Sequence, residues 1–259
     1  MESDHVVRLT ISGDSEEELQ VTVPEEKQKA TMEDHTAQIR SMVRTIFNLD
    51  LDLSGFYALL RNKGRLSWVR EQGAGRLLRA PTVWEDLAKT LLTTNTTWAM
   101  TRQMVRRLVS LGPVDCHGNH AFPGPEEVVS LGQDAFSSHV QAGYRSPYLY
   151  ELAQKIADGS IQVEQWANGE FPSDELYRKI TGLKGFGSYA AGAVMKLLGY
   201  YDRLAIDSSA RSMCAQSSGS DASPADRDIR ERYREYGDWQ GLALWMDLLE
   251  YYRQRETLQ

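Results

Sequence analysis

The segment 177–211 constrains the fold more than any other part of the sequence. A helix with apolar periodicity is predicted to end at Gly182, a tight turn follows over 183–187, and a second helix is predicted from residue 188. The glycines of this turn suit a chain reversal close to another molecule. The N–H groups that begin the second helix can bind a phosphate. Without further information, an ordinary helical hairpin with no ligand explains the same pattern.

The rest of the chain is predicted to be mostly helical after about residue 33. Two β-branched runs, 6–11 and 18–23, flank a turn-rich segment and predict a small N-terminal β-hairpin. Loops are predicted at 112–124 and 217–224 because glycine, proline and serine are concentrated there. Apolar periodicity and capping residues predict helices at 82–94, 97–111, 124–131, 134–141, 146–158, 172–181, 188–198, 208–216, 224–236 and 239–254.

The formal net charge of −7 argues at first sight against a nucleic-acid ligand, but the acidic excess is local. Residues 1–35 hold ten acidic and three basic residues, so residues 36–259 are balanced. Within that balanced part, residues 61–107 hold ten basic and three acidic residues. A polyanion would interact with this basic stretch, although such stretches are also common on ordinary solvated surfaces.

Several classes of protein are disfavoured by the sequence. No apolar run is long enough to span a membrane, and the N-terminus does not have the features of a secretory signal. Two cysteines give neither a disulfide framework nor a four-thiolate metal site, and the five histidines lack metal-ligand spacing. We therefore expect a monomer without metal or cofactor, in the cytoplasm (with the nucleoid in a bacterium) or in the nucleus.

The sequence Leu-Lys-Gly-Phe-Gly-Ser-Tyr-Ala-Ala at 183–191 resembles the L-P-G-V-G-x-x-x-A hairpin of the helix-hairpin-helix–GPD superfamily of DNA glycosylases. Asp207 follows the second hairpin glycine by 20 residues, at the position of the superfamily's aspartate. The segments 91–109, 140–156 and 236–249 are similar, in the same order, to segments of the alkylpurine and 8-oxoguanine branches. The four-cysteine iron–sulfur cluster of another branch is absent from the sequence. The resemblance covers about residues 80–250.

This resemblance implies a mostly α fold in which two helical subdomains flank an active-site cleft, with a small N-terminal β-hairpin or sheet. It predicts an N-terminal β element over residues 1–30. One helical subdomain is then formed by 31–90 together with 212–259. The other, 91–211, carries the helix-hairpin-helix and Asp207.

The resemblance also implies a catalytic role for Asp207. Its carboxylate would stabilise the positive charge that develops on the sugar as the N-glycosidic bond breaks. Asp207 also precedes a predicted helix, so it is expected to be an N-cap in either case. Members of the superfamily with lyase activity carry a lysine where this chain has Tyr189, which implies a monofunctional glycosylase that uses water. Lys184 lies in the turn and Lys196 about two helical turns further on, so neither is expected to replace that lysine.

The remaining site residues follow from the segments they occupy. A base must leave the helical stack to be excised, and the resemblance implies that aromatic residues line its pocket: Tyr189, Trp98, Tyr144, Tyr148 and Trp245. Each of these could instead be a core residue. Asn95 matches the residue that fills the gap left by the base, or it is a helix N-cap. The residues expected to bind DNA phosphates are Lys184, Gly185, Gly187, Arg102, Arg106 and Arg211, each of which could also be an ordinary exposed residue.

The sequence therefore predicts a monofunctional DNA glycosylase of base excision repair that acts on double-stranded DNA, with an alkylated purine as the first choice of substrate. The alternative substrates are oxidised or mismatched bases. A non-catalytic helix-hairpin-helix protein that only binds DNA is the alternative outside the enzymes, and a helical protein-interaction scaffold is the least favoured.

Overall fold

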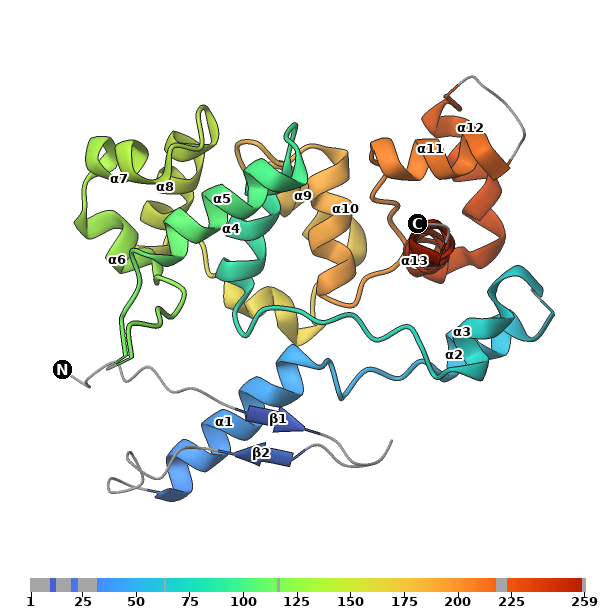
Figure 1. Ribbon diagram of the computed structural model, residues 1–259, viewed down its shortest axis with the longest axis horizontal. Coiled ribbons are helices and arrows are strands. Elements are labelled where there is room, and N and C mark those ends of the chain that lie inside the picture. Colours follow the sequence, from blue (N-terminus) through green and yellow to red (C-terminus); the bar gives the residue numbers. More distant parts are fainter. Residues whose placement is uncertain are drawn as a thin grey trace. The chain divides into compact units, whose positions relative to one another are not determined.

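The computed structural model of the chain describes residues 10–12, 20–22, 32–62, 64–115, 117–217 and 223–257. It is dominated by α-helices (Figure 1). The chain divides into two compact units. The first consists of residues 1–44 and 96–160, and the second of residues 45–95 and 161–259.

The first unit contains strands β1 (Thr10–Ser12) and β2 (Gln20–Thr22), which pair antiparallel with Ile11 opposite Val21. The rest of both predicted strand runs lies outside the described residues. Helix α1 (Met32–Ile46) follows. The unit continues with α5 (Trp98–Val109), α6 (Pro125–Ser130), α7 (Gln133–Val140) and α8 (Arg145–Ala157), in which α8 packs against both α6 and α7.

The second unit begins with short helical elements and one longer helix. These are α2 (Ser54–Leu59), the 3-10 helices η2 (Leu60–Asn62) and η3 (Gly64–Leu66), α3 (Ser67–Glu71) and α4 (Val83–Thr93). The N-terminus of α4 is closed by two side chains. Thr82 accepts a hydrogen bond from the Glu85 N–H group, and Glu164 accepts from the N–H groups of Val83 and Trp84 at 2.9 and 3.0 Å. Glu164 belongs to the 3-10 helix η4 (Val163–Asn168), which packs on α4.

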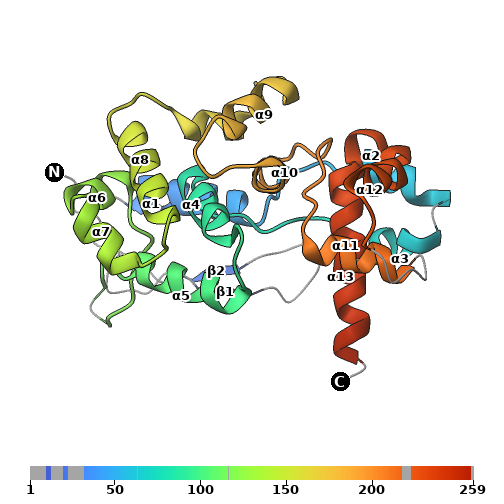
Figure 2. The ribbon, with the colours of Figure 1, turned by 90° about the horizontal axis from the view of Figure 1, so that it is seen from above.

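The predicted hairpin consists of α9 (Ser173–Thr181) and α10 (Ser188–Leu197), which pack against each other (Figure 1). The C-terminal part of the second unit contains α11 (Ser208–Ser217), α12 (Asp226–Tyr233), η5 (Arg234–Trp239) and the long helix α13 (Gln240–Thr257). Helices α11 and α12 both pack on α13 (Figure 2).

The core of the second unit includes a row of stacked aromatic rings. Trp239 lies between Phe56 and Tyr201, with ring centroids 5.4 and 5.3 Å away. Leu204 and Ile206 are buried in the same core. Because these side chains are anchored, the segment 201–206 that leads to residue 207 is fixed by packing rather than left as an exposed loop.

The predicted helices at 82–94, 97–111 and from 124 to 254 are confirmed, with ends that differ by a few residues. For residues 33–72 the sequence predicts helical structure but not the bounds of the individual helices. The division into units also differs from the expected one. The hairpin and residue 207 share a unit with 45–90 and 223–257, whereas the sequence placed them in a separate subdomain.

Candidate active site

Residue 207 is positioned by a segment held between two helices. The N–H group of Gly241, in the first turn of α13, donates a 2.6 Å hydrogen bond to the carbonyl of Tyr201, and the Gln240 side chain donates to the carbonyl of Asp202 at 2.6 Å. A Cβ atom added at Gly241 would lie 2.2 Å from the carbonyl oxygen of Arg203, and one at Gly192 of α10 would lie 2.9 Å from that of Leu204. Both glycines therefore permit the close approach that fixes this segment.

Asp207 caps helix α11 as predicted. Its Oδ1 atom accepts a hydrogen bond of 2.8 Å from the N–H group of Ala210. The side chain is half-buried, and among the described residues Oδ2 accepts no hydrogen bond. One carboxylate oxygen is thus fixed by the helix, while the other is left for a ligand.

Tyr189 in the first turn of α10 lies near Asp207. It is half-buried and hydrogen-bonded to the side chain of Thr93 at the end of α4. Burial raises the pKa of the Tyr189 phenol, the hydrogen bond with Thr93 partly opposes this shift, and the negative charge of Asp207 adds to it. Tyr189 is therefore a neutral hydroxyl at physiological pH, next to the carboxylate.

Lys196 is the most unusual residue of this region. It lies two turns beyond Tyr189 on α10, only 8% exposed, with its Nζ atom 3.7 Å from the centroid of the Trp245 ring on α13. Burial lowers its pKa to about 7, and the nearby Asp207 carboxylate partly opposes this shift. Among the described residues it forms no ion pair or hydrogen bond. Its charge is balanced mainly by the face of Trp245 and by Asp207.

Two side-chain pairs link α10 and α13 in this region. Tyr189 of α10 interacts electrostatically with Tyr252 of α13, and Lys196 of α10 lies on the ring of Trp245 of α13. On each helix the two residues are seven positions apart. Seven residues are two helical turns, so these side chains lie on the facing sides of two helices that run in opposite directions. Asp207 is electrostatically coupled to both Tyr189 and Lys196. The structure therefore brings Asp207, Tyr189 and Trp245 of the predicted site together with Lys196.

The hairpin turn leaves backbone N–H groups available for an anion. Gly187 is the N-cap of α10 but has no side chain to cap it, so the first N–H groups of α10 lack intrahelical partners. Gly185 has a φ of 87°, which favours glycine, and Lys184 is exposed. This arrangement is suited to a phosphate group.

The predicted residues Trp98, Tyr144, Tyr148, Arg102 and Arg106 lie in the first unit. Trp98 begins α5 and is 70% exposed, while Arg102 and Arg106 on the same helix are exposed. Tyr144 and Tyr148 are in contact edge to face at 5.8 Å, and the Arg145 guanidinium lies 4.5 Å from the Tyr144 ring centroid. For Trp98, the alternative of a buried core residue is excluded.

Asn95 is not a helix N-cap. It is exposed, with a φ of 46° in the left-handed region, and it follows the end of α4. Thr97 caps α5 instead, because its side chain accepts from the N–H group of Met100. Asparagine adopts this backbone conformation more readily than most residues, and Asn95 is exposed there.

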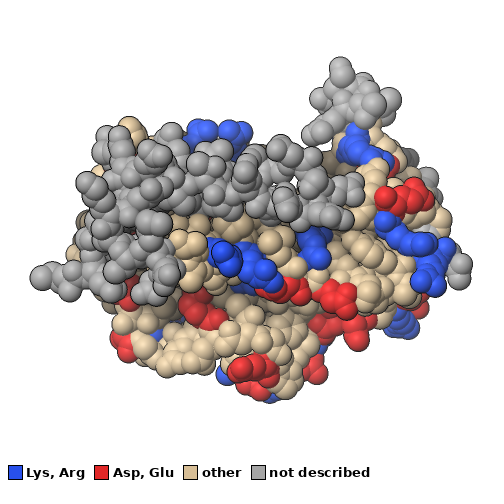
Figure 3. Space-filling model, turned by 90° about the horizontal axis from the view of Figure 1, so that it is seen from below, with Lys and Arg blue, Asp and Glu red and all other residues tan. Residues whose placement is uncertain are grey.

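Three of the ten basic residues of 61–107 form ion pairs or lie close to a carboxylate within the part of the protein that the structure describes. Arg65 forms an ion pair of 2.5 Å with Asp247, Arg79 lies 3.7 Å from Asp86, and Lys89 pairs with Glu85. On the face drawn in Figure 3, basic and acidic side chains both occur across the described surface. The stretch is therefore not a uniform cationic patch.

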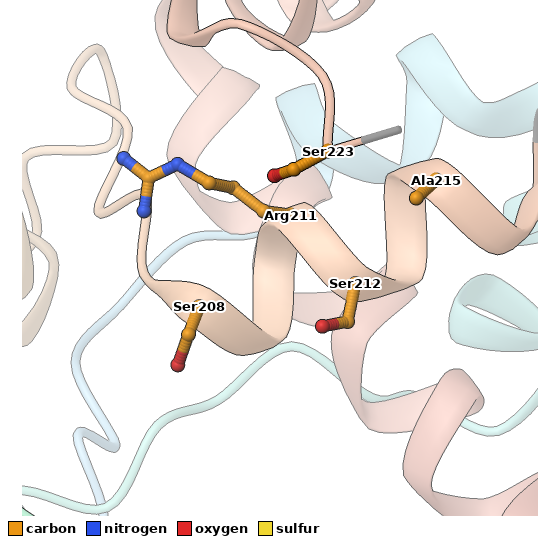
Figure 4. A pocket seen from close by; sticks show the side chains of 5 residues that line it. All are labelled: Ser208, Arg211, Ser212, Ala215 and Ser223. Atoms are coloured by element: carbon orange, nitrogen blue, oxygen red, sulfur yellow. The ribbon is translucent and has the colours of Figure 1, made fainter. Parts of the chain in front are cut away.

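Arg211 is also paired. Its guanidinium donates to Oδ1 of Asp226 at 2.7 Å. It borders a surface hollow of about 310 Å³ beside α11, lined as well by Ser208, Ser212, Ala215 and Ser223 (Figure 4). A phosphate would have to compete with Asp226 for Arg211.

Sequence reasoning missed Lys196 as a site residue because it was judged only by its distance from the hairpin glycine. The signal that could have identified it is a lysine seven residues after Tyr189, on the same face of an otherwise apolar helix.

Among the described residues, no group of three or more histidine, cysteine or carboxylate side chains could hold a metal ion. None of the described helices has the length and apolar character needed to cross a membrane.

No protein-family model and no curated protein matches the sequence. Solved structures do match. MBOgg1 in complex with a low-affinity DNA ligand has 21% identity and a TM-score of 0.74, covering 98% of this chain and 84% of that one. The 8-oxoguanine glycosylase/lyase of Clostridium acetobutylicum, bound to double-stranded DNA, has 18% identity and a TM-score of 0.72, covering 96% and 82%. The 3-methyladenine DNA glycosylase of Archaeoglobus fulgidus has 18% identity and a TM-score of 0.72, covering 95% and 83%. The chain therefore has the same fold as these DNA glycosylases.

Proposed function

We propose that this protein is a DNA glycosylase of base excision repair that extrudes a damaged purine from double-stranded DNA and hydrolyses its N-glycosidic bond. The observation that carries the proposal is the half-buried carboxylate of Asp207. It has one oxygen fixed by α11 and the other without a hydrogen bond among the described residues, and it lies beside Tyr189 behind the uncapped hairpin.

Each part of this region has a role in the proposed reaction. The N–H groups at the start of α10 and the exposed Lys184 hold the phosphates next to the damaged nucleotide. The carboxylate of Asp207 stabilises the positive charge that develops on the sugar as the base leaves. Position 189 holds a neutral phenol rather than an amine, so water is the proposed nucleophile.

The substrate class has two candidates. The aromatic residues expected around the pocket favour a cationic alkylated purine, which stacks well on aromatic rings. The Lys196 side chain over Trp245 favours a neutral damaged purine instead, because it places a second cation where the base would bind. We take the neutral purine, such as an oxidised guanine, as the candidate that the geometry supports best.

The test is base release by the Asp207→Asn variant. Single-turnover release is measured on duplexes that carry different damaged purines, with heat or alkali revealing abasic sites. Asparagine is also a good N-cap, so the variant removes the negative charge and keeps the cap of α11. We expect release to fall by about 100-fold or more.

Asp158→Asn is the matched control. The Asp158 carboxylate accepts a 2.9 Å hydrogen bond from the N–H group of Ser160 at the surface of the first unit. We expect this variant to keep the wild-type rate. Undiminished release by Asp207→Asn would overturn the catalytic assignment. A wild-type protein that binds DNA in a salt-sensitive way and releases no base from any duplex would be a non-catalytic DNA-binding protein.

A further inference from the structure

We propose that Lys196 contacts the extruded base and selects for a neutral base that offers a hydrogen-bond acceptor at its edge, against a cationic one. The inference rests on the proposed function and deepens it, since it assigns the substrate class to one side chain that sequence reasoning had set aside. It depends on the position of Lys196 relative to Asp207, on its burial and on its contact with Trp245.

Lys196 lies further along α10 than Tyr189, beyond the place where the sugar of the nucleotide would bind. Tyr189 lies in the first turn of α10, next to the uncapped N–H groups where a phosphate would bind. Lys196 lies two turns further along the same face, which is about 10 Å deeper. Asp207 is coupled to both residues. A nucleotide whose sugar lies at Asp207 would therefore extend its base along α10 from Tyr189 toward Lys196.

The chemistry of Lys196 then decides which base fits. An ammonium group has three hydrogen-bond donors and no acceptor, so it pairs with a carbonyl oxygen or a ring nitrogen. Lys196 is 8% exposed, and among the described residues its Nζ atom donates no hydrogen bond, so a base acceptor would supply the missing partner. The same group already lies on the Trp245 ring, 3.7 Å from its centroid, where a cationic base would otherwise stack. Two cations at this distance repel each other in a poorly solvated site.

The protonation state of Lys196 controls this selection. Burial lowers its pKa to about 7, so the group changes charge within the physiological range. The groups that face it are Trp245, which does not titrate, and the Asp207 carboxylate, which favours the ammonium form. Burial raises the pKa of Tyr189, on the same helix, so its phenol stays neutral in this range, and Tyr252 of α13 lies beside Tyr189. Discrimination against cationic bases is therefore expected to weaken as the pH rises above about 7.

The experiment compares two matched duplexes with the full-length protein. One carries a neutral purine with an added carbonyl, 8-oxoguanine or hypoxanthine, and the other carries cationic 7-methylguanine. Single-turnover release is measured at about pH 6 and about pH 8, with spontaneous depurination subtracted. The quantity compared is the ratio of the two rates, neutral over cationic. Lys196→Met removes the charge and Lys196→Arg keeps it at both pH values. Lys155→Met, which alters a half-buried lysine of α8 that pairs with Glu151, is the control.

We expect the wild-type ratio to fall by about threefold or more from pH 6 to pH 8. At pH 6 we expect Lys196→Met to lower it by about tenfold, the effect of about one unfavourable charge contact. Lys196→Arg should keep a ratio that does not change with pH, which a purely structural role would not produce. Lys155→Met should match the wild type.

A ratio that Lys196→Met leaves unchanged, while circular dichroism shows a folded protein, would overturn the inference and leave the proposed function intact. So would an Arg variant that loses selectivity as fully as the Met variant while remaining folded. A wild-type protein that releases neither base would overturn the inference, and the proposed function would fall with it only if the wild type also releases no base from any of the other damaged duplexes.

Discussion

The two oxygens of Asp207 are in different situations. Oδ1 accepts from the N–H group of Ala210, and Oδ2 has no hydrogen bond among the described residues. An N-cap orients a carboxylate, because one of its oxygens accepts from a backbone N–H group in the first turn of the helix. Capping and catalysis are therefore compatible roles for one residue, and the Asp207→Asn variant separates them because asparagine retains only the first.

Lys196 makes stability depend on pH. Its pKa is about 7 in the folded protein and about 10.5 in the unfolded chain, so between these values the unfolded state binds more protons. Stability should therefore rise with pH, by about 2 kcal/mol between about pH 7 and about pH 9. We expect Lys196→Met to remove this rise, as measured by urea unfolding at several pH values. Lys155→Met should retain it, and an unaltered slope in Lys196→Met would contradict the assignment.

At the scale of elements, helix α4 depends on a side chain distant in the sequence. Glu164 accepts from two N–H groups at its N-terminus, 81 and 80 residues away. A carboxylate at this end also interacts favourably with the helix dipole. This contact joins η4 to the helix that carries Thr93, the hydrogen-bond partner of Tyr189.

Removing this cap should destabilise the second unit. We expect Glu164→Ala to lower the free energy of unfolding by about 1–2 kcal/mol, and Glu164→Gln by about half as much, because the amide keeps one acceptor. Chemical denaturation provides the measurement. Glu170→Ala, at an exposed position nearby in the sequence, should change stability by less than about 0.5 kcal/mol. Equal stability of Glu164→Ala and the wild type would show that solvent replaces the cap.

The approach of α13 to the segment before Asp207 requires a glycine. A Cβ at position 241 would lie 2.2 Å from the carbonyl oxygen of Arg203, which is backbone and cannot rotate away. We expect Gly241→Ala to cost more than about 2 kcal/mol of stability and to slow base release, because the segment that holds Asp207 must shift. Gly64→Ala is the control, since nothing lies within 4 Å of its added Cβ. A Gly241→Ala protein with wild-type stability and rate would show that the segment is not fixed there.

At the scale of the whole molecule, the acidic residues are concentrated in the first part of the chain. Residues 1–27 hold eight acidic and two basic residues. Removal of this segment should leave DNA affinity unchanged or raise it, because a polyanion is repelled by this charge. Fluorescence anisotropy with a labelled duplex, over a range of salt concentrations, is the measurement. Loss of binding in a truncated protein that circular dichroism shows to be folded would mean that the segment contributes to DNA binding.

Much of the helical architecture could be predicted from the sequence. The ends of α4, α5 and α10 follow from Thr82, Thr97 and Gly187, whose effects on the backbone are local. The division into units could not be predicted, because it depends on which helices share a core. Contacts far apart in the sequence join these elements: α4 packs on α10 of the hairpin, η3 packs on α13, and Phe56 stacks on Trp239 of η5.

The sequence by itself determined the hairpin, the N-cap at Asp207 and the absence of a lysine at position 189, since each depends on a few adjacent residues. Only the tertiary structure decided that Lys196 is buried against Trp245 beside Asp207, that Asn95 is exposed in a left-handed conformation, and that Arg211 pairs with Asp226. The physical reason is that burial, and with it the pKa and charge of a side chain, is set by neighbours that come from other helices.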